Sequence, residues 1–283
     1  MKDTHRLEVE RWRAARDAAL RRSTGWLTLV GLSWLHQGEN VVGSGPSSDV
    51  LLPPGRAPEV VGTVGLERGV VTFVPHPGSG VTSEGHPVTA SIALKDDAGG
   101  RRPTMLRVGP IAFHVIDREG EKAVRVRDTG SPALSTFEGM SYFPIDPSWR
   151  VAARFEAFEP SISALLPNVL GRAETYLTPG RLDFGVGGER YRLDAFREAG
   201  GDDLFVVFGD ATNGLETYGG GRYLHAPLPD ANGRVTLDFN MAYNPPCVFT
   251  PFATCVLPPP QNRLPLRIEA GEKRYEREVP TGR

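Results

Sequence analysis

The chain has little of what marks the specialised classes of protein. Its 283 residues include only two cysteines, Cys247 and Cys255, so a disulfide framework is not expected. Lysine and arginine number 32 against 34 aspartates and glutamates, which leaves no overall field to attract nucleic acid or an anionic membrane. No run approaches the roughly 18 apolar residues that a membrane span needs. We therefore predict neither a nucleic-acid partner nor a membrane partner.

Targeting signals and common enzyme motifs are missing as well. The segment from Met1 to Arg6 is charged and has no apolar signal core, which favours a cytoplasmic protein. There is no Gly-x-Ser-x-Gly elbow, no His-Glu-x-x-His pair, no Walker sequence and no dinucleotide fingerprint. The common hydrolase, metalloprotease and nucleotide-binding mechanisms lose support, and no cofactor is predicted.

The N-terminus carries the one clear helical pattern. Residues 4–22 predict an amphipathic helix that Asp3 or Thr4 can cap. We expect its apolar face to consist of Val9, Trp12, Ala15 and Ala19. Much of the remaining surface is rich in arginine but interrupted by acidic residues, which favours a solvated face over one that binds nucleic acid or lipid.

The rest of the chain predicts a mainly β protein. The 33 glycines and 25 prolines favour many turns between short strands. We expect an N-terminal helix over residues 1–24, a β-sandwich-like half over 25–130, and an antiparallel β meander or barrel over 131–283. The strongest hairpin signal joins residues 181–186 to 190–193 through Gly187 and Gly188.

The segment from Asp238 to Asn244 gathers polar side chains next to prolines. On an extended strand Asp238 and Asn240 share one face. Tyr243 and Asn244 precede two prolines, which fix the exit of the chain. These side chains, and Asn262 after a second proline run, either contact a ligand or satisfy backbone groups of the proline loops.

Residues 210–222 form a glycine-rich connection that contains Thr212, Tyr218 and Arg222. It lacks the features of a phosphate cradle, and hairpin geometry is one explanation of its glycines. The alternative is that the connection contributes to a binding site through Arg222, because a guanidinium can bind a carboxylate or phosphate through two hydrogen bonds.

Further acid–base candidates lie near the C-terminal end of the meander. Glu269 and Glu272 form an acid–base pair if they face one cavity, and belong to an exposed turn if they do not. Arg127 either neutralises one of them or pairs with a surface acid.

Cys247 and Cys255 allow three interpretations. They are buried small hydrophobes, a reactive or paired thiol, or metal ligands, and the tight ligand pairs of a zinc site are absent. A reactive thiol requires a nearby cation or histidine, for which His225 and His114 are the candidates. No metal site is predicted.

Several of these segments resemble one known family. They are the glycine-rich run 210–224, the polar run 238–247, Cys255 with residues 258–264, the opening 25–32 and the piece 124–128. Together they resemble the bacterial family of domain of unknown function 1684 over nearly the whole chain. That resemblance implies no reaction.

The first β half carries a second resemblance. Residues 38–44 and 48–53 resemble the opening strands of forkhead-associated domains, which bind phosphopeptides. That family places an Arg where this chain has Ser44, and a Ser and His pair where this chain reads Pro58 to Gly62. Phosphate recognition needs those donors, so the resemblance implies the sandwich shape without phosphothreonine binding.

The leading functional hypothesis is a small polar or anionic ligand bound by the C-terminal half, with metal-free hydrolysis as its extension. Its catalytic candidates are Asp238, Glu269 and Glu272. Its ligand-binding candidates are Arg222, Asn240, Tyr243, Asn244, Asn262, Thr212, Tyr218 and Arg127. A forkhead-like module that contacts a protein without catalysis is the alternative, and a purely structural partner is the third.

Overall fold

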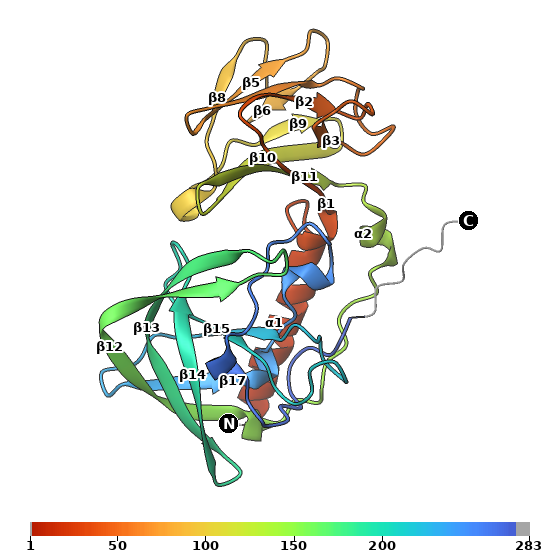
Figure 1. Cartoon of the computed structure of the whole chain (residues 1–283). Helices are drawn as coiled ribbons and strands as arrows, with labels where there is room; N and C mark the ends of the chain where they lie inside the picture. The colour runs from red at the N-terminus through yellow and green to blue at the C-terminus, as the bar shows by residue number, and fades with distance from the viewer. Residues whose placement is uncertain (1, 276–283) are drawn as a thin grey trace. The chain divides into compact units, whose positions relative to one another are not determined.

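The structure, a computed structural model that describes residues 2–275, is mainly β with one long helix (Figure 1). It confirms the predicted fold class. The chain forms two compact units. The first comprises Met1–Ala19 and Glu138–Arg283, and the second comprises Leu20–Phe137. The second unit is thus inserted between two parts of the first. Within residues 2–275, no helix is long and apolar enough to cross a membrane.

The second unit is built from two sheets. One has the order β1-β11-β10-β9-β6-β7 and the other the order β3-β2-β4-β5-β8. Their bounds are β1 Leu29–Trp34, β2 Gly38–Gly43, β3 Val50–Leu51, β4 Gly62–Glu67, β5 Val70–Pro75, β6 Thr82–Ser83, β7 His86–Pro87, β8 Ile92–Leu94, β9 Leu106–Val108, β10 Ile111–Arg118 and β11 Glu121–Asp128. The short helices are η1 Trp26–Thr28, η2 Ala98–Gly100 and α2 Pro132–Thr136.

Side chains from both sheets share one buried core. Phe73 of β5 and Phe113 of β10 meet edge to face with ring centroids 5.9 Å apart. Val64 and Val126, also fully buried, belong to the same cluster. Because the two sheets bury their apolar faces against each other, this unit is a β sandwich.

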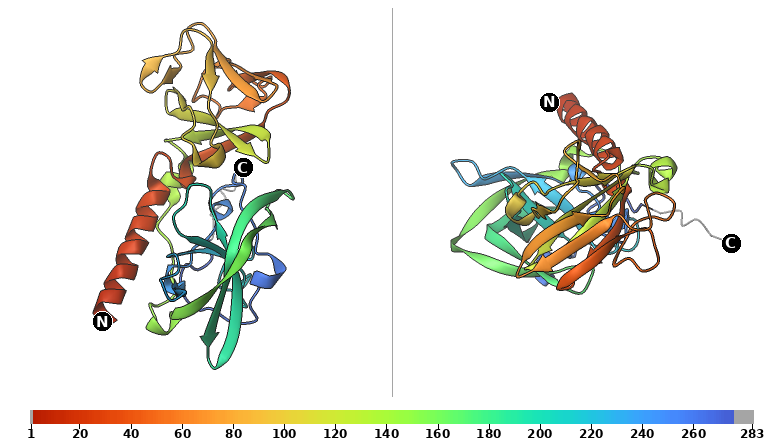
Figure 2. Two further views of the ribbon diagram at one scale, coloured as in Figure 1. Left: turned by 90° about the vertical axis from the view of Figure 1, so that its left-hand side faces the viewer. Right: turned by 90° about the horizontal axis from the view of Figure 1, so that it is seen from above.

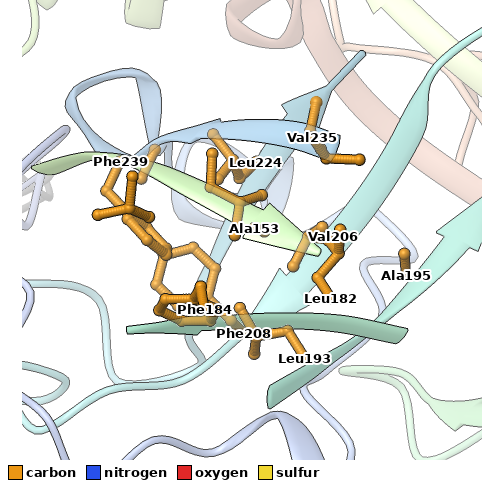
Figure 3. Close-up of a cluster of buried hydrophobic side chains, with 14 of the residues drawn as sticks. Ala153, Leu182, Phe184, Leu193, Ala195, Val206, Phe208, Leu224, Val235 and Phe239 are labelled. Carbon is orange, nitrogen blue, oxygen red and sulfur yellow. The ribbon is translucent and has the colours of Figure 1, made fainter. Parts of the chain in front are cut away.

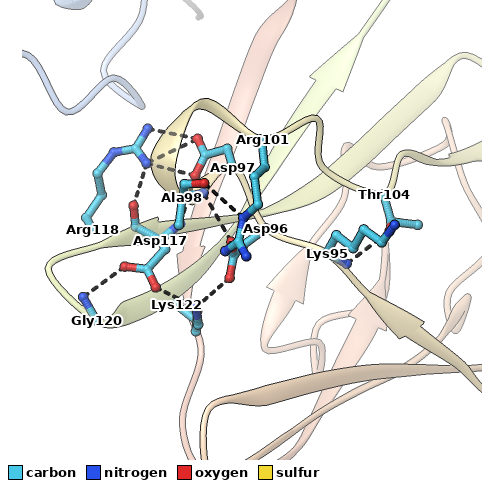
Figure 4. Close-up of polar contacts among 10 residues, drawn as sticks. All are labelled: Lys95, Asp96, Asp97, Ala98, Arg101, Thr104, Asp117, Arg118, Gly120 and Lys122. Atoms are coloured by element: carbon cyan, nitrogen blue, oxygen red, sulfur yellow. Dashed lines mark hydrogen bonds and ion pairs between the residues drawn. The ribbon is translucent and has the colours of Figure 1, made fainter. Parts of the chain in front are cut away.

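An ion-pair network lies at the end of the β10–β11 hairpin (Figure 4). Nζ of Lys122 donates to Asp96 Oδ2 at 2.6 Å and also to Asp117. Arg118 donates to both carboxylate oxygens of Asp97. The network joins the hairpin to the loop after β8 through charge-assisted hydrogen bonds.

The first unit is an antiparallel six-stranded sheet of order β16-β15-β14-β13-β12-β17, curled into a half-barrel (Figure 1). Its strands are β12 Arg150–Pro167, β13 Ala173–Val186, β14 Glu189–Arg197, β15 Leu204–Phe208, β16 Arg222–Ala226 and β17 Arg234–Asp238. Four 3-10 turns accompany them: η3 Pro147–Trp149, η4 Phe239–Met241, η5 Pro246–Val248 and η6 Pro260–Asn262.

The predicted hairpin through Gly187 and Gly188 is confirmed as the β13–β14 connection. The concave face of the sheet encloses a buried core (Figure 3). There Phe239, which follows β17, packs against Phe184 and Phe208 with ring centroids 5.7 and 5.4 Å apart. This packing fixes the end of β17, from which the polar segment continues.

Helix α1, Lys2–Arg21, lies at the flank of the first unit (Figure 2), where its contacts with Glu272 and Asp238 are made. Val9 is fully buried as predicted, but Ala15 is exposed. With 3.6 residues per turn, the position seven after Val9 returns to the same side of the helix, and that position is Arg16. A cation thus occupies the inward face, because it finds a carboxylate and an aromatic ring there.

Candidate functional site

Asp238 and Asn240 come together, but not on one extended strand. Strand β17 ends at Asp238, whose Oδ1 accepts a hydrogen bond from the backbone N–H of Asn240 at 3.1 Å and so starts η4. The side-chain amide of Asn240 donates to the same oxygen at 2.9 Å and to the carbonyl of Asp146. On the other carboxylate oxygen, Nε2 of His5 lies at 2.6 Å. All of these polar groups serve contacts inside the protein.

Glu272 and Asn244 meet under helix α1. The fully buried carboxylate of Glu272 accepts hydrogen bonds from Nε of Arg16 at 3.1 Å and from the N–H of Asn244 at 2.6 Å. Asn244 donates from its amide to the carbonyl of Lys273 at 2.8 Å. Burial raises the pKa of Glu272, and Arg16 and the Asn244 N–H oppose that rise.

Arg222 and Asp210 form an ion pair in the core. Both side chains are fully buried, and Nη2 of Arg222 donates to Asp210 Oδ2 at 2.7 Å. The guanidinium also donates to the carbonyls of Ile268 and Ala270. Thr212 donates its hydroxyl to Asp210 at 2.6 Å. A ligand that recruited Arg222 would have to displace these contacts.

Asn262, Glu269 and Arg127, three further predicted residues, have separate partners. Asn262 is buried and bonds to the backbone of Asp194 and Val207. Glu269 is exposed and pairs with Arg267, so it does not share partners with Glu272. Arg127 lies on β11 in the other unit and donates to the carbonyl of Gly25 at 2.6 Å.

In the segment that resembles a phosphopeptide-binding loop, the polar groups of Ser44 are bonded to nearby backbone carbonyls. Ser44, at the position of that family's Arg, donates its hydroxyl to the carbonyl of Ala57 at 2.8 Å and its N–H to that of Pro58 at 3.0 Å.

Tyr243 belongs to a cluster that the sequence analysis did not assemble. Its hydroxyl lies 2.8 Å from Nε2 of His225, and Nδ1 of His225 lies 2.9 Å from Oδ2 of Asp203. Glu198 approaches Nε2 at 3.9 Å. The His225 side chain is 36% exposed, so this chain of hydrogen bonds reaches solvent. We refer to Asp203, His225, Tyr243 and Glu198 as the His225 cluster.

The geometry indicates how the proton is placed. A carboxylate can only accept, so Asp203 accepts from Nδ1 and leaves Nε2 of the neutral ring to accept from the Tyr243 hydroxyl. Burial raises the pKa of Tyr243 above its usual range, which keeps the phenol protonated. Burial also raises the pKa of Glu198, assisted by Asp203 and opposed by His225.

Tyr243 is held on both sides. Its backbone pairs with that of Tyr223, which lies two residues before His225 on β16. Cζ of Arg16 lies 4.6 Å from the centroid of the Tyr243 ring, and the ring of Trp12 lies 6.3 Å away. Helix α1 thus supplies one wall of the phenol, in addition to its contact with Glu272.

A weak signal for the His225 cluster is present in the sequence. His225 occupies the one exposed position of the otherwise buried strand β16. The acidic turn that holds Glu198 and Asp203 is more than 20 positions away and meets His225 only through the register of β15 and β16, in which Phe205 faces His225. That register cannot be read from the chain. Among residues 2–275, no group of three or more His, Cys, Asp or Glu side chains is arranged to hold a metal ion.

Comparison with known proteins finds a family to which no function is assigned. Residues 135–273 match the family described as protein of unknown function (DUF1684). A similar solved structure is that of an uncharacterized protein from Haloarcula marismortui, which is 39% identical over 49% of this chain and 78% of that one, with a TM-score of 0.42. No curated protein matches. Through residues 135–273, the chain is thus similar to the DUF1684 family of proteins of unknown function.

Proposed function

We propose that the C-terminal part of the chain binds a small polar molecule over His225 and Tyr243 and catalyses a general acid–base reaction on it, with hydrolysis as the expected form. One observation carries the proposal. Both ring nitrogens of a partly exposed histidine are engaged, Nδ1 by a carboxylate at 2.9 Å and Nε2 by a phenol at 2.8 Å. A carboxylate on Nδ1 orients the ring and stabilises its protonated form.

Each residue has a role in this proposal. A water molecule or ligand hydroxyl that replaces the Tyr243 hydroxyl at Nε2 gives its proton to His225 as its oxygen attacks the substrate. The freed phenol of Tyr243, kept protonated by burial, donates a hydrogen bond to the negative oxygen that develops. His225 then returns the proton to the leaving group. Positioned proton transfer of this kind contributes about 10²–10⁴-fold to a rate.

The charges around His225 select the kind of ligand. Asp203 and Glu198 place two carboxyl groups beside the ring, and like charges repel at these distances. The nearest cation over Tyr243, Arg16, is already bonded to Glu272. We therefore propose a neutral or cation-bearing ligand in preference to the anionic one that the sequence also allowed.

A ligand screen with matched variants tests the proposal. Thermal unfolding is measured with panels of neutral, cationic and anionic metabolites. A true ligand at about 100 times its Kd should stabilise the native protein by about 2.7 kcal/mol. His225→Asn should abolish that stabilisation, whereas His86→Asn, which replaces an exposed histidine on β7, should leave it unchanged. Equal stabilisation of the wild type and His225→Asn by every active compound would contradict the proposal.

Turnover of the compounds found in the screen tests the chemistry separately. His225→Asn should lower kcat by about 10²–10⁴-fold. Tyr243→Phe keeps the ring but removes the proton donor, so it should lower kcat with a smaller change in KM. Binding of a compound over His225 without any turnover would support the proposed binding site and contradict the proposed catalysis.

A further inference from the structure

The proline loop and the glycine-rich connection meet at a pair of cysteines. Both thiols are free. The backbone N–H of Cys247, in η5, donates to Sγ of Cys255 at 3.1 Å. On the other side, Sγ of Cys247 lies 3.6 Å from the hydroxyl of Tyr218. The three side chains therefore form one contact group, which we call the Cys247 cluster.

The two thiols are within reach of each other. Sγ of Cys255 touches the backbone nitrogen of Cys247, and only Cα and Cβ separate that nitrogen from the second sulfur. The two sulfurs therefore lie near each other, as a disulfide requires. The chain around Cys255 is held by paired backbone, since the Val169 N–H donates to its carbonyl at 2.9 Å and Val256 pairs with Asn168.

The two thiols have unequal surroundings. Cys255 is 5% exposed, whereas Cys247 is only partly buried. The hydrogen bond from the Cys255 thiol lowers the pKa of Cys247, against the effect of burial. Burial raises the pKa of Cys255 well above its usual value. Burial and the bond with Cys247 also raise the pKa of Tyr218, so its phenol stays protonated and can donate to a Cys247 thiolate.

We propose that Cys247 and Cys255 are a redox-active dithiol, in which Cys247 is the peroxide-reactive thiol and Cys255 is the thiol that resolves it. The proposal rests on the 3.1 Å contact between the two residues, on the Tyr218 hydroxyl at the outer sulfur and on the difference in burial. It is independent of any chemistry at His225.

The chemistry balances with a peroxide as the oxidant. The Cys247 thiolate attacks one oxygen of hydrogen peroxide, the O–O bond breaks, and the products are a Cys247 sulfenic acid and hydroxide, which takes a proton to become water. The Cys255 sulfur then attacks the sulfenic sulfur, the S–O bond breaks, and a second water leaves with the Cys255 proton. A dithiol reductant returns the disulfide to two thiols.

The test uses the full chain and hydrogen peroxide. Intact-mass measurement after brief exposure should show the loss of two hydrogens in a monomer, reversed by dithiothreitol. Cys255→Ser should instead accumulate a sulfenic acid that dimedone traps on Cys247. Cys247→Ser should give neither product, and Tyr218→Phe should slow the first step.

A measurement on the unmodified chain keeps the test independent of the variants' folding. Iodoacetamide should alkylate Cys247 at least about tenfold faster than Cys255 in the native protein. The proposal is overturned if the two rates are equal, if peroxide leaves both thiols free, or if the oxidised product is a dimer linked between chains.

Discussion

Nε2 of His5 lies 2.6 Å from Oδ2 of Asp238, although 233 positions separate the two residues in the sequence. The contact joins the first turns of α1 to the end of β17, within one unit. Because Asp238 also accepts from Asn240, this carboxylate fixes both the helix and the start of η4.

Replacing either partner of this contact should destabilise the protein. His5→Ala and Asp238→Ala should each lower the free energy of unfolding by about 1–3 kcal/mol, because a buried polar partner loses its hydrogen bond. The double variant should reveal a coupling of about 0.5–3 kcal/mol in urea unfolding. The exposed pair of Glu8 with Arg150 provides a control, and Glu8→Gln should change stability by less than about 1 kcal/mol. Additive losses would show that the His5–Asp238 contact contributes no energy of its own.

The buried carboxylate of Glu272 should give the stability a pH dependence of known sign. Its pKa in the folded protein lies above the ordinary value of 4.5, so the folded state binds the proton more tightly than the unfolded state. The resulting stabilisation is complete below the unfolded pKa and is lost as pH rises through the folded pKa. Denaturant unfolding across this range should show the loss in the wild type and not in Glu272→Gln. A parallel pH dependence in the two proteins would contradict the prediction.

Asp96 should act with the opposite sign in the second unit. Burial raises the pKa of Asp96, but the bonds from Lys122, the Ala98 N–H and Arg101 outweigh it and hold the pKa below 3.8. Its stabilisation is therefore present above the unfolded pKa and is lost as pH falls through the folded pKa. Asp96→Asn should cost about 1–3 kcal/mol at neutral pH and little in strong acid. Glu67→Gln, at an exposed position of β4, is the control and should be neutral at both pH values.

Replacement of Gly271 by a residue with a side chain should destabilise the protein. Its φ is +78°, and a Cβ there would lie 2.4 Å from the carbonyl oxygen of Ala242. Gly188 has a similar φ of +87° with nothing within 4 Å, so Gly188→Ala measures the backbone strain alone, about 1–2 kcal/mol. Gly271→Ala should cost about 1–3 kcal/mol more, because it adds the clash. Equal losses in thermal or urea unfolding would show that the chain around Ala242 yields to the new methyl group.

Local features of the fold could be predicted from the sequence, and features set by distant pairing could not. The Gly187–Gly188 hairpin follows from residues that are neighbours in the chain, and the structure contains it. The predicted apolar face of α1 is wrong at Ala15, because Arg16 takes the inward position through its hydrogen bond to Glu272, 256 positions away. A pattern of apolar residues along the helix cannot predict that a charged side chain with a distant partner faces inward.

The candidate site shows the same division. The polar segment after β17 is visible in the sequence, and Tyr243 lies in it. His225, Asp203 and Glu198 become a cluster only through the pairing of β15 with β16 and the turn that follows β14. Arg222 stood out in the sequence as a potential anion clamp, but its charge is matched by Asp210 within the core.

The insertion of the sandwich into the other unit determines which truncated forms of the protein keep the first unit intact. Nη2 of Arg21 donates to the carbonyl of Phe137 at 2.6 Å, so the stretch between Leu20 and Phe137 begins and ends at adjacent points. A fragment that starts at residue 135, where the family match begins, would be expressed without His5, Trp12 and Arg16. A deletion that instead joins Ala19 to Glu138 through a short peptide keeps them, and is the shorter protein in which the proposed activity should be tested.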